Sequence, residues 1–337
     1  MSRVPTAEIV VDGRSLSIPE SGLIAMSVSI GSGPSVDAAT LALSWYSPVA
    51  ATEPGAPVEV SLGYEGENEL VLTGDVQRAT GAPWGVRLDV HAEPGRLQRV
   101  RVGQSFLDQT AADIISTLAG EADVRTGELA SGDPLAAYHV DEHRTAWRHA
   151  NDLARLVGGQ LTTEPDGALS MLVAGGGGAL GGLADAAASA AGSLLGGAGG
   201  YRYGAELLDV AIVRSMAEPT PQVVPHGAAS PLGGDKWHLL LREPDGGAPG
   251  EPTLVPAAIR DQSGADTFRG GIEVLASRAA ATGRLAVRGV ASLRVGDSIE
   301  VGDWPHGEPP AFRVADVQHR MSRADGFASH VRLEQAA

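Results

Sequence analysis

The chain has 337 residues, 43% of them hydrophobic and 4% aromatic, and this length allows two or three domains with cores of their own. The absence of cysteine excludes a disulfide framework and thiolate metal sites. The net charge of −16 argues against a nucleic-acid-binding protein, because the phosphate backbone would repel the chain.

Short alternating segments fill the first hundred residues. Residues 7–11 and 23–30 have the period-2 pattern of strands and are expected to pair with each other, and residues 40–45 alternate as well. No signal-peptide core precedes them, so export by the usual secretory route is not expected. About six short strands are enough to close a barrel or a sandwich, which we place at residues 1–99.

The pattern changes to helical spacing in the next segment. A capping sequence at Thr110 predicts a helix over residues 110–122. A second helix is expected from about Thr145, with glycines at 158 and 159 as its stop. The sequence that follows reads as a hairpin around a Pro-Asp-Gly turn. Residues 100–173 are therefore expected to form a small α+β domain.

A stretch rich in glycine and alanine, residues 174–200, follows. Its composition is typical of a flexible linker or insertion, and its glycines together with Asp185 make a membrane span improbable. The G-x-G-x-x-G match at residues 176–181 resembles a dinucleotide fingerprint, but no βαβ unit with an acidic ribose ligand follows it. We therefore interpret the whole stretch as a connector.

The remaining residues, 201–337, are expected to form a second β-barrel domain. Residues 206–213, 237–242 and 285–290 are strand-like, and residues 268–282 have a helical, alanine-rich pattern.

The strongest signal in the sequence is an internal repeat of one β-module. Residues 55–93 and 296–334 share a frame of three alternating segments, without a gap, at a constant offset of 241 residues. The anchors of the frame are Gly55 and Gly296, Glu59 and Glu300, Asp75 and Asp316, and Gly85 and Gly326.

The repeat makes a specific prediction about the two cores. Equivalent apolar residues should be buried in equivalent places and in the same register, because a one-residue slip would turn them outward. The expected core residues are Val58, Val60, Val76 and Val90 in the first module and Ile299, Val301, Val317 and Val331 in the second. Glu59 and Glu300 should then face the opposite side, together with Asp75 and Asp316.

One motif could carry metal chemistry. His139, Glu142 and His143 match H-x-x-E-H, the inverted zinc-peptidase motif, which needs both histidines on one helical face. Because the helix is expected to begin only at Thr145, the histidines would lie too far apart on an extended segment to bind one ion. His319 is expected to be a packing or strand-edge histidine. No nucleophile elbow, phosphate loop or calcium loop is present, so we assign no catalytic, cofactor-binding or metal residue.

The order of these features resembles the hub proteins of contractile injection systems and contractile phage tails, which include late control protein D and the N-terminal half of VgrG spikes. Three stretches carry the resemblance over nearly the whole chain. They are residues 138–159 with the hairpin after them, residues 201–208, and residues 293–331.

The resemblance implies a mainly β fold, with two related β-barrel domains joined by a small α+β domain. It implies a non-enzymatic structural hub, a homotrimer that matches a hexameric inner tube to a separate trimeric spike and contacts other baseplate proteins. Such a hub would be made in the bacterial cytoplasm and assembled into a particle, without inserting into a membrane. Two alternatives remain open: a tail-associated zinc peptidase or cell-wall hydrolase, and a monomeric glycan- or peptide-binding module.

Overall fold

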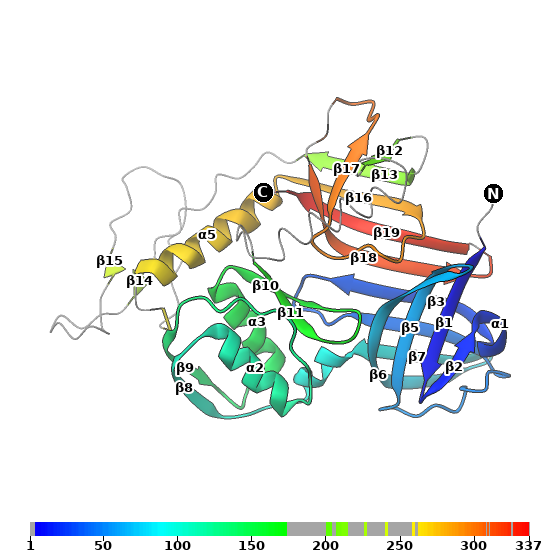
Figure 1. Cartoon of the computed structure of the whole chain (residues 1–337), viewed down its shortest axis with the longest axis horizontal. Helices are drawn as coiled ribbons and strands as arrows, with labels where there is room; N and C mark the ends of the chain where they lie inside the picture. The colour runs from blue at the N-terminus through cyan, green and yellow to red at the C-terminus, as the bar shows by residue number, and fades with distance from the viewer. Residues whose placement is uncertain are drawn as a thin grey trace.

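The computed structural model describes residues 4–173, 200–203, 207–214, 226–227, 240–241, 258–259, 262–307, 309, 311–324 and 326–336. Half of these residues lie in β-strands, and the fold is mainly β with an α+β unit, as predicted (Figure 1). The fingerprint at 176–181 and all but the last residue of the predicted connector lie outside the described residues. No described helix is long and apolar enough to cross a membrane.

Seven strands, one helical turn and one 3-10 helix form what we term the first module. They are β1 (Pro5–Val11), β2 (Arg14–Ser17), α1 (Ile18–Ser21), β3 (Leu23–Gly31), β4 (Ala38–Ser44), β5 (Pro57–Tyr64), β6 (Glu67–Ala82), β7 (Gly85–Ala92) and η1 (Glu93–Gln98). The expected pairing of residues 7–11 with 23–30 is wrong. β1 pairs with β2 and β5, whereas β3 pairs with β4 and β18, because a tight Asp12-Gly13 turn returns β1 to β2 first.

The middle unit contains the predicted helices and hairpin. Its elements are β8 (Gln104–Gln109), α2 (Ala111–Glu121), β9 (Leu135–Val140), α3 (Ala146–Leu156), β10 (Gly159–Thr163) and β11 (Leu169–Val173). The Thr110 hydroxyl accepts from the Asp113 amide, and Thr145 caps α3 in the same way. Gly158 has φ +70°, a left-handed conformation that ends α3 and that a residue with a Cβ would adopt with strain.

The second module is built from the C-terminal strands. They are β12 (Gly200–Arg202), β13 (Leu207–Arg214), β16 (Ala281–Arg288), β17 (Ser298–Gly302), β18 (Phe312–Ser322) and β19 (Gly326–Gln335). The helix α5 (Gln262–Arg278) precedes β16, and it begins and ends earlier than the predicted 268–282. The strand expected at 237–242 is described only as β15 (Leu240–Leu241), which pairs with β14 (His226–Gly227).

One sheet runs through both modules. Its order is β13-β16-β19-β18-β3-β4-β7-β6-β5-β1-β2, with β17 and β12 attached beside β18. Figure 1 shows β18 of the second module lying next to β3 of the first, with the middle unit to one side and α5 above it. Among the described strands this path is open, so the two modules form one continuous sheet and closure of either into a separate barrel is not seen.

The predicted burial of the repeat is confirmed. All eight core residues are at most 4% exposed, four in the first module's core and four in the second's. Glu59 and Glu300 are exposed, as alternation requires. Asp75 differs from a solvated acid because η1 covers it, so it is only 7% exposed although it points away from the strand core.

The predicted common register is wrong by three residues. The Gly55 amide donates to the Val76 carbonyl in the first module, but the Gly296 amide donates to the Val314 carbonyl in the second, where an offset of 241 would require Val317. The segment from Gly296 to Val314 is three residues shorter than that from Gly55 to Val76, whereas a β-bulge stands at the equivalent place in both modules. The extra residue follows Val76 in β6 and Val314 in β18, and it resets the alternation so that both Val314 and Val317 are buried.

The duplication extends to strands that the sequence comparison missed. The pair β3–β4 has a bulge between Leu23 and Ala25, and the pair β13–β16 has one between Leu207 and Asp209. Because the bulge occupies the same place in both pairs, β3 corresponds to β13 and β4 to β16. The two modules thus share five strand positions rather than three.

Candidate functional site

The junction between the two modules joins strands that lie far apart in the sequence. Over β18 and β3 the ladder runs antiparallel from Asp316 opposite Gly31 to Ser322 opposite Ala25. On its outer face the Gln318 amide donates to the Ser27 hydroxyl at 3.1 Å. The junction holds the first and second modules in one fixed orientation.

The second module also completes the core of the first. Met321 and Phe327, from the hairpin of β18 and β19, are 4% and 5% exposed and belong to the first module's hydrophobic core. The Phe327 ring lies 5.9 Å from that of Tyr64 at the end of β5. The Arg294 guanidinium donates to the Leu70 carbonyl of β6 at 3.1 Å. The first module is therefore incomplete without the second.

A buried carboxylate lies beside the junction. Asp37 is 6% exposed and accepts a hydrogen bond from the Gly31 amide at 2.8 Å. Burial raises the pKa of Asp37 to about 7, although the bonds from Gly31 and Thr163 lower it, and the nearby Asp316 raises it further. Asp37 therefore has a neighbour from each unit: Gly31 of the first module, Asp316 of the second module and Thr163 of the middle unit.

Two ion-pair clusters tie the other units together. The Arg96 guanidinium of η1 binds both carboxylate oxygens of Asp75 in β6, at 2.6 and 2.9 Å, and donates to the Asp123 carbonyl of the middle unit. On the far side, Glu334 of β19 lies 3.1 Å from Arg313 and 3.6 Å from Arg278 of α5. Both clusters are mostly buried, and burial lowers the pKa of Arg278 and Arg313.

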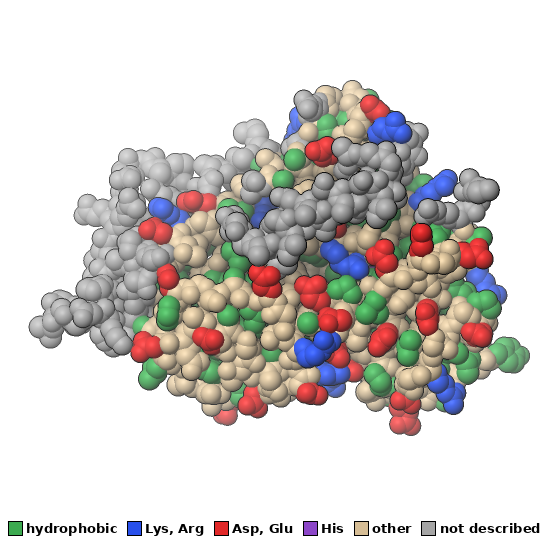
Figure 2. All heavy atoms as spheres, viewed as in Figure 1, with side chains coloured by type: hydrophobic (Ala, Val, Ile, Leu, Met, Phe, Trp, Pro, Cys, Tyr) green, Lys and Arg blue, Asp and Glu red, His purple; other side chains and the backbone are tan. Residues whose placement is uncertain are grey.

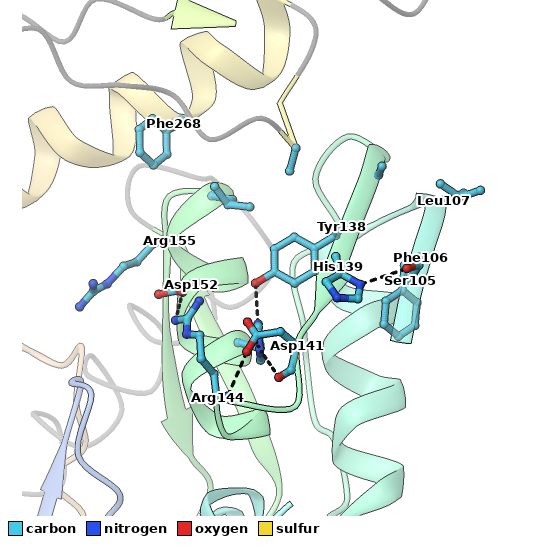
Figure 3. Close-up of a pocket in the computed structure, with 14 residues that line it drawn as sticks. Ser105, Phe106, Leu107, Tyr138, His139, Asp141, Arg144, Asp152, Arg155 and Phe268 are labelled. Carbon is cyan, nitrogen blue, oxygen red and sulfur yellow. Dashed lines mark hydrogen bonds and ion pairs between the residues drawn. The ribbon is translucent and has the colours of Figure 1, made fainter. Parts of the chain in front are cut away.

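The middle unit contains a cavity of about 620 Å³ (Figure 3). Its lining comes from β8, β9, the turn before α3, one face of α3 along most of its length, and α5, where Phe268 lies across from Tyr138. The Tyr138 hydroxyl lies 3.1 Å from His149 Nδ1, and His149 Nε2 lies 3.2 Å from the Asp141 carbonyl oxygen. Arg144 pairs with Asp152 at the rim.

The polar groups of this cavity stabilise the fold rather than form a catalytic set. His149 is 1% exposed, and burial lowers its pKa. Both of its ring nitrogens have partners, so neither is available as a metal ligand or general base. Burial also raises the pKa of Tyr138 to about 12, which keeps the phenol protonated. The network fixes β9 against α3.

The three residues of the H-x-x-E-H match do not come together on a helix. His139 lies in β9 with its Nδ1 3.1 Å from the Ser105 hydroxyl, while Glu142 and His143 are exposed in the turn before α3. Among the described residues no group of three or more His, Asp or Glu side chains could hold a metal ion. The motif therefore lacks the helical geometry that zinc peptidases require.

His319 is a packing histidine, as expected. It is fully buried, its Nδ1 lies 2.9 Å from the Ser329 hydroxyl, and burial lowers its pKa to about 3. The sequence singled out neither the Asp37 site nor the Tyr138–His149 network, because each depends on contacts between segments far apart in the chain.

The described part of the surface in view carries many acidic side chains. Figure 2 shows acidic side chains spread over this face and outnumbering the basic ones, in line with the net charge of −16. Large exposed hydrophobic side chains gather instead at one end of the first module, where β4 ends and β7 begins. They are Trp45, Tyr46 and Trp84, which are 53%, 97% and 49% exposed.

Comparison with known proteins gives matches in structure only. No family model matches the chain, and no curated protein matches its sequence. A tail protein from Neisseria meningitidis is similar with a TM-score of 0.68 and 14% identity, covering 98% of this chain and 97% of that one. The 43 kDa tail protein of prophage MuSo2 from Shewanella oneidensis is similar with a TM-score of 0.66 and 13% identity, covering 98% of both chains.

A component of the type VI secretion system from Escherichia coli is also similar, with a TM-score of 0.55, 11% identity, and coverage of 94% of this chain and 74% of that one. That protein is itself described as structurally similar to tail proteins of bacteriophage T4. The chain therefore has the fold of phage tail proteins and type VI secretion components, as the resemblance to a baseplate hub or VgrG-like protein implies.

Proposed function

We propose that this chain is the structural hub of a contractile injection system or phage-tail-like particle. In this role it is a homotrimer that matches a hexameric inner tube to a trimeric spike and contacts other baseplate proteins. It is made in the cytoplasm before assembly and has no catalytic role. The single observation that supports it most is the duplicated module, since three chains then offer six near-equivalent modules around one axis.

The symmetry argument explains why a duplication suits this position in a particle. A trimer of identical single modules presents three equivalent surfaces, and a hexameric tube then finds a partner for only half of its subunits. Doubling the module within each chain gives six similar surfaces on the tube side, while the differences between the two modules preserve threefold symmetry for the spike. The fold shared with phage tail proteins supports the same role.

We also propose the division into residues 1–99, 100–173, 174–200 and 201–337. Three separate hydrophobic cores support it, although the second module contributes Met321 and Phe327 to the first core. Limited proteolysis should therefore cut preferentially between residues 174 and 199 and leave the two fragments associated.

The oligomeric state tests the proposed function directly. Native mass spectrometry of the purified chain should give a mass of three chains of 34.4 kDa, and electron microscopy of the chain mixed with its tube and spike proteins should show it between them. A chain that stays monomeric both alone and with those proteins contradicts the proposal. Stoichiometric bound zinc that is lost in His143→Ala would favour the peptidase alternative instead.

A further inference from the structure

Two strands of the continuous sheet have an edge without a strand partner in the described part of the chain. β13 pairs with β16 alone and ends the sheet. β6 pairs with β5 only up to Asp75, so after its bulge the segment Arg78–Ala82 is paired with β7 on one side only. Exposed edges of this kind are available for pairing with another chain.

The structure contains a template for how these edges can be filled. β18, the counterpart of β6, pairs with β19 on one side and, after its own bulge, with β3 on the other. β3, the counterpart of β13, is thereby covered. Among the described strands, the β6 edge of the first module after the bulge and the β13 edge of the second module therefore have no neighbour. The junction between β18 and β3 within the chain joins the counterparts of these two edges.

Burial supports the view that both edges are incomplete. Met26 and Val28 of β3 are 4% and 0% exposed, whereas their counterparts in β13, Val210 and Ile212, are only half-buried. When positions on β19 and on β7 are counted from the residues opposite the two bulges toward the hairpin turn, Phe327 corresponds to Trp84. Phe327 is 5% exposed because it enters the neighbouring module's core, and Trp84 is 49% exposed.

We propose that β6 of one copy pairs with β13 of the next copy, antiparallel, in the register that β18 and β3 have within the chain. In the template, Gln318 lies opposite Ser29. Counted from the bulges, Thr80 is the counterpart of Gln318 and Val213 is the counterpart of Ser29. Thr80 therefore lies opposite Val213 of the partner subunit. In the same register Trp84 packs on the second module of the next copy, as Phe327 packs on the first module within the chain. The contact is head-to-tail, so it closes into a ring when the rotation allows.

This inference rests on the proposed function for the number of copies, which the strand pairing alone does not fix. It adds the surface by which one chain recognises the next. Intrachain and interchain junctions then alternate around the ring, and each free edge of β6 and β13 is covered.

Disulfide cross-linking of the full-length chain tests the register, and the absence of native cysteine makes each introduced pair unambiguous. Thr80→Cys combined with Val213→Cys should give covalent multimers up to the trimer under mild oxidation, because directly opposed Cβ atoms lie about 4.5–5.5 Å apart. Both side chains are exposed, so folding should be unaffected. Mixing chains that carry one substitution each, after dissociation and reassembly, should give covalent dimers and nothing larger.

Two controls frame the experiment. Gln318→Cys with Ser29→Cys tests the intrachain template and should give a cross-link within one chain. Glu59→Cys with Val213→Cys pairs the same β13 position with an exposed residue of β5 that the register does not place opposite it, and should cross-link at least about fivefold less, since its Cβ atoms are not adjacent.

The outcomes separate this inference from the proposed function. A trimer by native mass spectrometry without cross-linking at Thr80 and Val213 overturns the strand pairing and leaves the hub function standing. Cross-linking within a single chain overturns the pairing as well. A purified chain that is monomeric and does not cross-link between copies overturns both.

A side-chain substitution gives an independent readout. Trp84→Ala should weaken self-association by about tenfold or more, since a large aromatic residue at the centre of a contact contributes strongly to binding. Leu107→Ala removes a side chain that is 68% exposed in the middle unit and should change association less than about threefold. Equal effects of the two substitutions on the dissociation constant would contradict the placement of Trp84.

Discussion

The first and second modules share five strand positions, yet after the bulge β18 of the second module is paired on both sides, whereas β6 of the first has one partner among the described strands. Counterpart positions can also carry opposite charge. The bulge places Asp75 of β6 at the position of Arg313 in β18, and both point away from the core. Asp75 is covered by Arg96, whereas Arg313 is covered by Glu334. The acid and the base have exchanged places between the two ion pairs, and both pairs remain mostly buried.

This comparison shows which properties of a duplicated module tolerate change. The apolar alternation toward the core is kept in both copies, because a residue turned outward loses about 1.5–3 kcal/mol of burial. The outward faces differ, because they serve different neighbours. In the first module the outward face meets η1, whose Arg96 also bonds to the middle unit, and in the second it meets α5.

The largest effect is expected where the second module completes the first. Phe327→Ala should lower the free energy of unfolding by about 3–5 kcal/mol, because it leaves a cavity in the first module's core. The counterpart substitution Trp84→Ala should cost less than about 1 kcal/mol in the dissociated chain, since Trp84 is half exposed. Denaturant unfolding at low protein concentration measures both. Equal losses of unfolding free energy in the two variants would contradict the view that Phe327 fills a junction within the chain and that Trp84 does not.

A smaller but clear difference is expected for the paired acids. Asp75→Ala should cost about 2–3 kcal/mol, because it leaves the Arg96 guanidinium partly buried without its bidentate partner. Asp316→Ala should cost less than about 1 kcal/mol, because its partner Arg332 is 60% exposed. Thermal unfolding of both variants tests the contrast. A larger loss for Asp316→Ala would show that the exposed pair in the second module is the more important.

Truncating one core residue in each module tests whether the two modules are equally stable and unfold together. Val60→Ala and Val301→Ala should each cost about 1–3 kcal/mol through lost burial and cavity formation, since both side chains are at most 4% exposed. Because the modules share a sheet and a core, each variant should unfold in one transition. Separate transitions, seen by fluorescence and circular dichroism, would show that the junction does not couple them.

A further effect is expected at Asp37 and depends on pH. The pKa of Asp37 is about 7 when folded and 3.8 when exposed, so between these values the folded state binds the extra proton and stability falls as pH rises. Asp37→Asn, which keeps an acceptor for the Gly31 amide, should be more stable than the wild type by about 4 kcal/mol at pH 8, because each of the roughly three pKa units corresponds to about 1.4 kcal/mol. The difference should disappear near pH 4. Unfolding measured across this range tests it, and a constant difference would exclude titration as the cause.

Much of the fold could be predicted from the sequence because it is local. The caps at Thr110 and Thr145, the stop at Gly158 and the repeat anchored at Gly55 and Gly296 all appear in the structure. Both of these repeat glycines have φ +96°, a conformation that favours glycine, so the anchors correspond to real backbone geometry.

The predictions that were wrong depend on pairing between strands that lie far apart in the chain. No residue pattern marks the bulges after Val76 and Val314, and the constant offset of 241 hides that the segment Gly296–Val314 is three residues shorter than Gly55–Val76. The pairing of β3 with β18 is equally invisible, since strand pairing across the chain follows from packing rather than from spacing. The junction and Asp37 therefore emerge only from the structure.

The junction between β3 and β18 also determines when the protein can mature during translation. Ser27 and Gln318, which meet across it, are 291 residues apart in the chain. At 5–20 residues per second, roughly 15–60 s pass between the synthesis of β3 and that of its partner strand. During that interval the nascent first module exposes the β3 edge and lacks Met321 and Phe327 in its core. The ribosome must therefore release the C-terminal hairpin before the N-terminal third of the molecule reaches its final stability, which makes premature termination near the end of the message damaging to its beginning.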